Sequence, residues 1–321
     1  MKAIIYHKTD LDGIFSGAIA FRALSTHRLL DIPLDYNDDL PDLMGCDEIF
    51  VLDIDLREDQ WDQLLGNYNI VHIDHHPGSR EKYPDRTLRG RYKFKGDSEK
   101  NRKAALELTW EFFNPPQSIP ETLRELSNWD IFRNRKENSW PKTRAIQLLT
   151  RFFIRDLNDA IAFLDNPYLT TPQLNLAMTM DKMKQRELDR VLEGSVVVDG
   201  VLCINSSDTF LSAYLDRPLM FYHFNGKEWK LSFRGKGSRQ RALDLQGGGH
   251  EEAASARVST DVLKDILEEC IFPLIPDLDF MALEELEKAW SQKALTITVT
   301  HSEEELRSAI EHLSQSNQGY L

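Results

Sequence analysis

Three short clusters of carboxylate and imidazole residues stand out near the start of this 321-residue chain. They span residues 7–13 (HKTDLDG), 53–55 (DID) and 74–76 (DHH). Asp and His without Cys form a ligand set that suits Mn²⁺, Mg²⁺ or Fe²⁺ better than a closed structural zinc site. Each cluster alone could be an ordinary polar turn, so the surrounding elements must decide whether they form one site.

A short apolar run precedes each cluster, as expected for strands buried in a parallel sheet. The predicted strands are residues 3–6, 49–52 and 70–73, and helical patterns follow at 13–24, 58–65 and 103–113. Alternating strands and helices indicate βαβ units and a parallel sheet. Ligands bind such sheets at the carboxyl ends of the strands. We therefore expect the three clusters to meet in one crevice.

Five or more carboxylates in one crevice would repel one another and raise one another's pKa unless cations bind among them. There are more carboxylates than one ion needs, which favours two divalent ions with one bridging Asp. Two ions about 3.5–4 Å apart can generate a hydroxide and neutralise phosphoryl oxygens. Hydrolysis of a phosphoester is the reaction that most naturally needs this arrangement.

These clusters resemble the motifs of the DHH phosphoesterase superfamily. The matching residues are His7, Asp10, Asp12, Gly13 and Ser16 in a first motif, Asp53 in a second, Asp74-His75-His76 in a third, and Asp130 of Asn128-Trp129-Asp130 in a fourth. The resemblance implies two Mn²⁺ ions, with Mg²⁺ as an alternative. One ion would be held by His7, Asp10 and Asp53, and the other by Asp12, Asp53, His75 and Asp130.

In the same resemblance Asp53 bridges the two ions, and two further residues take catalytic roles. His76 would face the substrate phosphate as a donor or acid. Asp74 would orient the neighbouring imidazoles without binding an ion itself. Asp55 is interpreted as a structural or supporting residue.

The second half resembles the substrate-binding DHHA1 domain of the same group. The residues that carry this resemblance are Arg234 and the loop Gly247-Gly248-Gly249-His250, which would hold substrate phosphate or nucleotide. Three glycines let backbone N–H groups approach an anion closely, and a guanidinium offers a bidentate phosphate donor. Residues 251–256 have a helical pattern, which would add a helix N-terminus to the loop. Lys236, Arg239 and Arg241 add local positive charge.

The predicted fold is therefore α/β with two domains. Residues 1–165 form a catalytic metal-binding domain, a parallel sheet with helices on both faces. Residues 166–195 form a linker helix, whose start is indicated by Thr171-Pro172. Residues 196–321 form a smaller mixed α/β domain with a C-terminal extension, in which Asn225-Gly226 predicts a hairpin. Within the extension we expect a strand at 295–299 and a helix with a capping box at Ser302 and Glu305.

The overall charge limits the partners. Lys plus Arg is 39 and Asp plus Glu is 52, so the net charge is −13, which excludes binding to long nucleic acid or an anionic membrane through a general basic surface. No apolar stretch is long enough for a transmembrane helix, and the N-terminal apolar run is too short for a signal peptide. Three widely spaced cysteines fit a reducing compartment. We expect a cytoplasmic protein that binds a short oligonucleotide or small nucleotide, with a homodimer left open.

Chain length favours the compact DHH/DHHA1 enzymes, which act on short oligoribonucleotides, phosphoadenosine phosphate or dinucleotides. The resemblance thus implies an oligoribonuclease-like or phosphoadenosine-phosphate phosphatase-like hydrolase, with substrate between the two domains. A pyrophosphatase or polyphosphatase of the same superfamily, and a non-catalytic nucleic-acid-binding module, remain alternatives. A haloacid-dehalogenase-like phosphatase using Asp53 and Asp55 would leave residues 74–76 unexplained.

Overall fold

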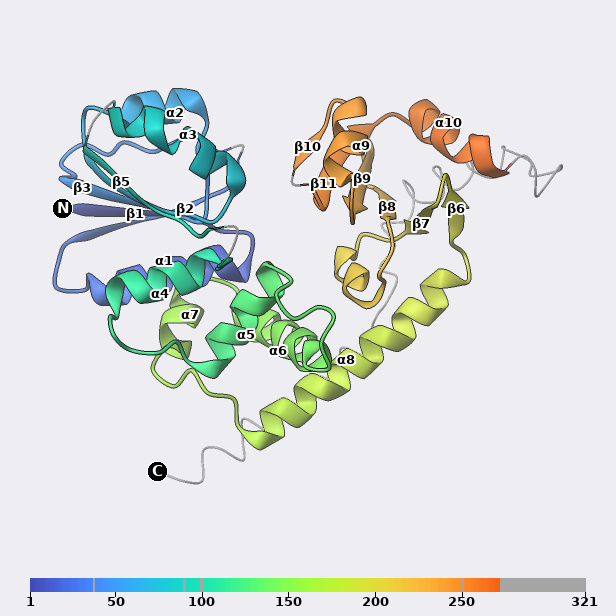
Figure 1. Cartoon of the computed structure of the whole chain (residues 1–321), viewed down its shortest axis with the longest axis horizontal. Coiled ribbons are helices and arrows are strands. Elements are labelled where there is room, and N and C mark those ends of the chain that lie inside the picture. The colour runs from blue at the N-terminus through green and yellow to red at the C-terminus, as the bar shows by residue number, and fades with distance from the viewer. Residues whose placement is uncertain (37, 89–90, 99–100, 250, 272–321) are drawn as a thin grey trace. The chain divides into compact units, whose positions relative to one another are not determined.

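The computed structural model describes residues 1–36, 38–88, 91–98, 101–249 and 251–271. The chain divides into two compact units, the first Met1–Arg190 and the second beginning at Val191. Each unit has a sheet of its own (Figure 1). Within the described ranges, no helix is long and apolar enough to cross a membrane.

The first unit contains a five-stranded, fully parallel sheet in the order β2-β1-β3-β4-β5. Its strands are β1 (Lys2–His7), β2 (Leu29–Leu34), β3 (Glu48–Leu52), β4 (Asn69–Ile73) and β5 (Arg91–Lys95). The three strands predicted from apolar runs are the central ones, β1, β3 and β4. The sequence missed β2 and β5, because edge strands are covered less completely and carry polar residues and proline, here Asp31 and Pro33 in β2.

Helices cover both faces of this sheet (Figure 1). Alternate side chains of the strands face two separate cores, with Ile4 and Tyr6 in one and Ala3 and Ile5 in the other. The first core includes α1 (Leu11–Ala23), α4 (Ala105–Phe113) and α7 (Leu157–Phe163), and the second includes α2 (Glu58–Leu64). α3 (Pro77–Leu88) follows β4 and contacts β5. Two covered faces explain the continuous apolar runs of the central strands, and the predicted α/β class is confirmed.

Three more helices complete the first unit: α5 (Glu121–Asp130), α6 (Trp140–Phe153) and α8 (Thr171–Leu192). α8 packs on α6, where Ala177 lies in a small apolar cluster with Ala145 and Leu149. The Arg144 guanidinium also donates to both carboxylate oxygens of Asp181, at 2.9 and 3.0 Å. The helix expected as a linker is therefore anchored to the first unit.

The second unit contains a six-stranded mixed sheet in the order β10-β11-β9-β8-β7-β6. Its strands are β6 (Val196–Val198), β7 (Val201–Asn205), β8 (Leu219–Phe224), β9 (Trp229–Arg234), β10 (Gly248–Gly249) and β11 (Ala253–Val258). Its helices are η1 (Thr209–Tyr214), α9 (Ser238–Asp244) and α10 (Thr260–Ile271). β8 and β9 form the antiparallel hairpin that Asn225-Gly226 predicted.

The helix expected at residues 251–256 is wrong, because this segment contains strand β11. The strand pairs with both β9 and β10, and alternate residues Ala254, Ala256 and Val258 are buried. Alanine and glutamate favour a helix locally, but pairing on two sides overrides that weak preference. The helix N-terminus expected beside the glycine loop is therefore absent from the described structure. The elements expected at 295–299 and from Ser302 onward lie outside the described residues.

Candidate metal centre

The three acidic and imidazole clusters come together at the carboxyl edge of the parallel sheet. His7 ends β1, Asp53 follows β3, and Asp74 to His76 follow β4, and these three strands are neighbours in the sheet. Ligand atoms lie within 4.8 Å of one another in three overlapping sets: His7, Asp10 and Asp53; Asp12, His75 and Asp130; and Asp53, Asp74, His75 and His76. The structure thus brings together every metal ligand that the sequence predicted.

The first set is built by the turn between β1 and α1. His7 Nδ1 lies 2.7 Å from Asp10 Oδ2 and 3.9 Å from Asp53 Oδ2. Asp10 is the N-cap of α1 and accepts the Gly13 N–H at 2.9 Å. A Cβ atom on Gly13 would lie only 2.1 Å from the His7 carbonyl oxygen. The glycine therefore lets α1 start directly against the end of β1, which fixes the spacing of this motif.

The second set joins residues that are far apart in the sequence. His75 Nε2 lies 3.2 Å from Asp130 Oδ2, 3.5 Å from Asp53 Oδ1 and 3.7 Å from Asp12 Oδ2. The two Asp12 oxygens also accept the backbone N–H groups of Ala105 and Leu106, at 2.8 and 2.7 Å. Asp12 thus caps the N-terminus of α4, a role that the sequence did not indicate.

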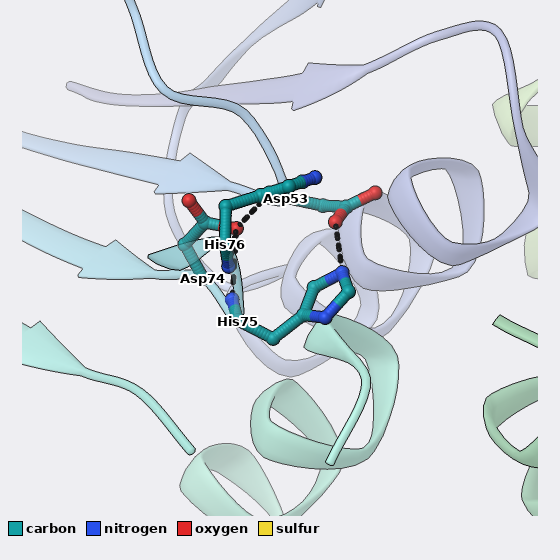
Figure 2. Close-up of side chains that lie close together, drawn as sticks. All are labelled: Asp53, Asp74, His75 and His76. Atoms are coloured by element: carbon teal, nitrogen blue, oxygen red, sulfur yellow. Dashed lines mark hydrogen bonds and ion pairs between the residues drawn. The ribbon is translucent and has the colours of Figure 1, made fainter. Parts of the chain in front are cut away.

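Asp53 occupies the centre of the cluster with an unusual backbone. Its φ angle is 56°, in the left-handed region that Asp and Asn tolerate better than most residues. Its backbone N–H donates to the Ile73 carbonyl at 3.0 Å, and the residue is 2% exposed. Figure 2 shows its carboxylate directed toward the imidazole of His75.

Two buried carboxylate oxygens, Asp53 Oδ1 and Asp130 Oδ2, receive no hydrogen bond among the described residues. Buried polar atoms are nearly always satisfied, and leaving a carboxylate oxygen without a donor is costly. A bound cation would satisfy both atoms. The residues present therefore fit the divalent ions that the sequence predicted.

Asp74 is fully buried and contacts the neighbouring residues of the DHH motif (Figure 2). Its Oδ1 accepts from His76 Nδ1 at 2.6 Å and from the His75 backbone N–H at 2.8 Å, while Ser79 Oγ donates to Oδ2. Burial raises the pKa of Asp74, but the neighbouring histidines, His76 above all, hold it well below its usual range. These are the contacts that an orienting carboxylate requires.

The cluster carries more negative charge than its surroundings stabilise. Burial raises the pKa of Asp12 and Asp53 well above the usual range, and neighbouring carboxylates raise both further. Burial also raises the pKa of Asp130. Asp10 differs, because its hydrogen bond and charge interaction with His7 outweigh burial and lower its pKa to about 2. Divalent cations bound among these carboxylates would offset their mutual repulsion.

Asp55 takes part in a polar network with Trp61 and Arg86. Its Oδ1 accepts from Trp61 Nε1 at 3.0 Å and from Arg86 Nη2 at 2.7 Å. The Arg86 guanidinium, itself buried, stacks 4.3 Å from the Trp61 ring. These contacts agree with the structural role expected for Asp55.

Sequence reasoning missed one aromatic residue at this edge. The Tyr36 ring lies 5.3 Å from the His7 ring, measured between centroids. Tyr36 follows β2, and because that edge strand was not predicted, its carboxyl end was not searched. Had the strand at residues 29–34 been predicted, Tyr36 would have been identified as a residue near its carboxyl end.

In the second unit, Arg234 ends β9 and its side chain is largely buried. Nη1 donates to the Phe233 carbonyl at 2.8 Å. Burial lowers the pKa of this guanidinium, and no carboxylate of the described residues forms an ion pair with it. A buried cation without an acidic partner is suited to receive an anion.

The glycine loop has two structural glycines and one without a packing role. A Cβ on Gly247 would lie 2.2 Å from the Ser255 carbonyl oxygen, and one on Gly249 would lie 2.5 Å from Ala254 Cα, so pairing of β10 with β11 requires both. A Cβ on Gly248 would meet nothing within 4 Å. Lys236 and Arg239 are exposed nearby in the sequence, and His250 lies outside the described residues.

No protein-family model and no curated protein matches this sequence. Similar solved structures include a pGpG-specific phosphodiesterase from Vibrio cholerae, with 13% identity over 84% of this chain and 97% of that one, at a TM-score of 0.49. Another is an exopolyphosphatase-related protein from Bacteroides fragilis, with 16% identity over 86% and 93% of the two chains and a TM-score of 0.47. A third is exonuclease RecJ bound to manganese, with 15% identity over 91% and 90% and a TM-score of 0.43. At 13–16% identity, these similarities concern the fold alone.

Proposed function

We propose that this protein is a metal-dependent phosphoesterase that hydrolyses short oligonucleotides or small nucleotides. The observation that carries the proposal is a pair of ligand sets joined by the contact of Asp53 with His75, with buried carboxylate oxygens that receive no hydrogen bond from the part of the chain that the structure describes. Divalent ions bound in such a site activate water and neutralise phosphoryl oxygens.

Asp53 is the residue best placed to bridge two ions. Its Oδ2 lies 3.9 Å from His7 Nδ1, in the first ligand set, and its Oδ1 lies 3.5 Å from His75 Nε2, in the second. His7 and Asp10 would complete the first ion site, and Asp12 and Asp130 the second. We propose Mn²⁺ as the ion and Mg²⁺ as the alternative, since carboxylate and imidazole ligands suit both.

His76 would donate to a substrate phosphate. Burial lowers the pKa of His76, but the hydrogen-bonded Asp74 carboxylate outweighs burial and raises it above its ordinary value. This favours the protonated imidazole, which can donate a hydrogen bond or a proton to a phosphate oxygen.

The second unit would contribute recognition. Arg234 offers a half-buried guanidinium that forms no ion pair with any described carboxylate, and a Cβ at Gly248 would meet nothing within 4 Å, so a ligand could approach the backbone there. Arg234, Gly248 and His250 would bind a terminal phosphate or nucleotide, whereas Gly247 and Gly249 would shape the loop. The net charge of −13 favours a short substrate over a long strand.

The test is a hydrolysis assay of the full chain with Mn²⁺ or Mg²⁺. The panel should contain di- to pentanucleotides, phosphoadenosine phosphate, cyclic dinucleotides, pyrophosphate and a long single strand. We expect turnover of the short nucleotide substrates that stops when a chelator is added. Preference for pyrophosphate would favour the polyphosphatase alternative, and binding without turnover under either ion would favour a non-catalytic module.

A further inference from the structure

Tyr36 is an exposed aromatic residue at the edge of the metal cluster. It lies two residues beyond the end of β2, whose last residue, Leu34, is aligned with His7 in the parallel pairing with β1. The tyrosine and imidazole rings are tilted by 55° with their centroids 5.3 Å apart. Tyr36 nevertheless remains 43% exposed, beside a predicted metal ligand.

The turn that carries Tyr36 is held on both sides. The Tyr36 backbone N–H donates to Asp35, and Lys8 Nζ pairs with Asp38 Oδ2 at 2.5 Å. Two side chains at the start of α2 donate to the Asp38 carbonyl oxygen, Arg57 at 2.9 Å and Gln60 at 2.8 Å. Hydrogen bonds and an ion pair therefore hold Asp35 and Asp38, on either side of Tyr36 in the sequence.

Packing does not explain why an aromatic ring is placed here. Tyr36 belongs to neither hydrophobic core of the first unit. Its ring contacts His7, which belongs with Asp10 and Asp53 to the ligand set assigned above to an ion. The ring is thus an apolar, planar surface next to the place where a phosphate would be held.

We propose that Tyr36 is a stacking platform for a nucleobase of the substrate, an inference that rests on the proposed function of the adjacent ligand sets. A phosphate held near His7 and Asp53 leaves the attached nucleoside close to the ring. Aromatic side chains stack on any base, because every base has a π-face. Tyr36 therefore selects substrates that carry a base over inorganic or aliphatic phosphates, with little preference among bases.

The test compares binding of two ligands that differ only by the base, AMP and ribose 5-phosphate, to the Mn²⁺-loaded full chain by calorimetry. We expect wild type to bind AMP more tightly. Tyr36→Ala should weaken AMP binding roughly 5- to 150-fold, the range that corresponds to a single base–aromatic stack, and leave binding of ribose 5-phosphate unchanged. Tyr36→Phe should keep most of the affinity, since it keeps the ring. Tyr168→Ala, which removes a 60% exposed tyrosine from the connection between α7 and α8, is the matched control.

The inference is overturned if wild type does not bind AMP more tightly than ribose 5-phosphate, or if Tyr36→Ala weakens both ligands equally. Mn²⁺ titration of Tyr36→Ala should show unchanged metal binding, so that loss of the ion is not mistaken for loss of stacking. Hydrolysis is measured on the same samples. If AMP binding depends on Tyr36 but no phosphoester is hydrolysed, the proposed enzymatic activity is contradicted and the stacking role is not. If nucleotides are hydrolysed equally well by wild type and Tyr36→Ala, only the stacking role is contradicted.

Discussion

At the scale of single residues, Asp53 combines two requirements that few residue types meet. Its backbone has φ 56°, and its two side-chain oxygens lie near members of both ligand sets, 3.9 Å from His7 Nδ1 and 3.5 Å from His75 Nε2. Asn shares the tolerance for a left-handed backbone but has no charge, whereas Ala lacks both properties. The two substitutions therefore separate the chemistry of the residue from its conformation.

We expect Asp53→Asn to abolish Mn²⁺ binding and hydrolysis while leaving the metal-free protein at least as stable as wild type. The physical reason is that burial and neighbouring carboxylates disfavour the charged form of Asp53. Asp53→Ala should also abolish Mn²⁺ binding and hydrolysis. In addition it should lower the free energy of unfolding by about 1–2 kcal/mol, because alanine would have to adopt the left-handed backbone conformation of Asp53. Calorimetric titration with Mn²⁺ and denaturant unfolding measure the two effects. Retained activity in Asp53→Asn would rule out the bridging assignment.

At the scale of elements, α4 connects the two ends of the second ligand set. Asp12 caps its N-terminus, and Glu107 on α4 accepts from Ser127 Oγ at 2.8 Å and from Arg133 Nη2 at 2.5 Å. Arg133 also donates to Asn128 at 3.0 Å. Glu107 thus holds the end of α5, where Asp130 lies, in position.

We expect Glu107→Gln to weaken one of the two Mn²⁺ sites about 10-fold, as supporting residues around metal ligands typically do, and to leave the other unchanged. The amide can still accept from Ser127 but loses the charge that pairs with Arg133. Glu121→Gln is the control, because it removes a more exposed ion pair, with Lys142, from the other end of α5. Calorimetry that resolves both binding steps measures the effect. Equal weakening of both sites, or of neither, would contradict the positioning role.

The glycine run at residues 247–249, which contains β10, offers a matched pair of glycine substitutions. Gly247→Ala should destabilise the second unit, because its methyl group would clash with the Ser255 carbonyl oxygen at 2.2 Å. Gly248→Ala should leave stability unchanged, since a Cβ meets nothing there, yet raise KM for nucleotides if backbone N–H groups at this position contact phosphate. Thermal unfolding and steady-state kinetics separate the two. Unchanged kinetics in Gly248→Ala would show that the loop is structural only.

At the scale of the whole molecule, the candidate metal ligands and the candidate recognition residues belong to different units. The seven residues proposed as metal ligands or as the orienting carboxylate, from His7 to Asp130, lie in Met1–Arg190, whereas Arg234 and the glycine loop lie beyond Val191. We therefore expect substitutions in the first unit to change ion binding, and substitutions in the second unit to change nucleotide recognition.

We expect Arg234→Gln to raise KM, or lower kcat/KM, for nucleotide substrates while Mn²⁺ affinity stays at the wild-type value. The substitution removes the positive charge of the Arg234 side chain and keeps a polar side chain of moderate size. Kinetics and Mn²⁺ calorimetry on the same preparation provide the measurement. If Arg234→Gln lost activity in proportion to a loss of Mn²⁺ binding, the proposal that the first unit binds the metal and the second recognises the nucleotide would be contradicted.

The sequence alone determined the features that depend on short stretches of chain. The apolar runs before Asp53 and Asp74 identified central strands, because strands covered on both faces must be continuously apolar. Parallel pairing then required their carboxyl ends to meet, so the ligand cluster followed from the same runs. Asn225-Gly226 fixed the β8–β9 hairpin for an equally local reason.

Only the tertiary structure decided the features that depend on partners distant in sequence. β11 is a strand because β9 and β10 pair with it, against the local helical preference of residues 251–256. The capping of α4 by Asp12, the contact of Glu107 with Arg133 and the contact of Tyr36 with His7 join residues 26 to 94 positions apart. Such contacts leave no local signature, because each side chain is ordinary for its own segment and gains its role only from where the fold places its partner.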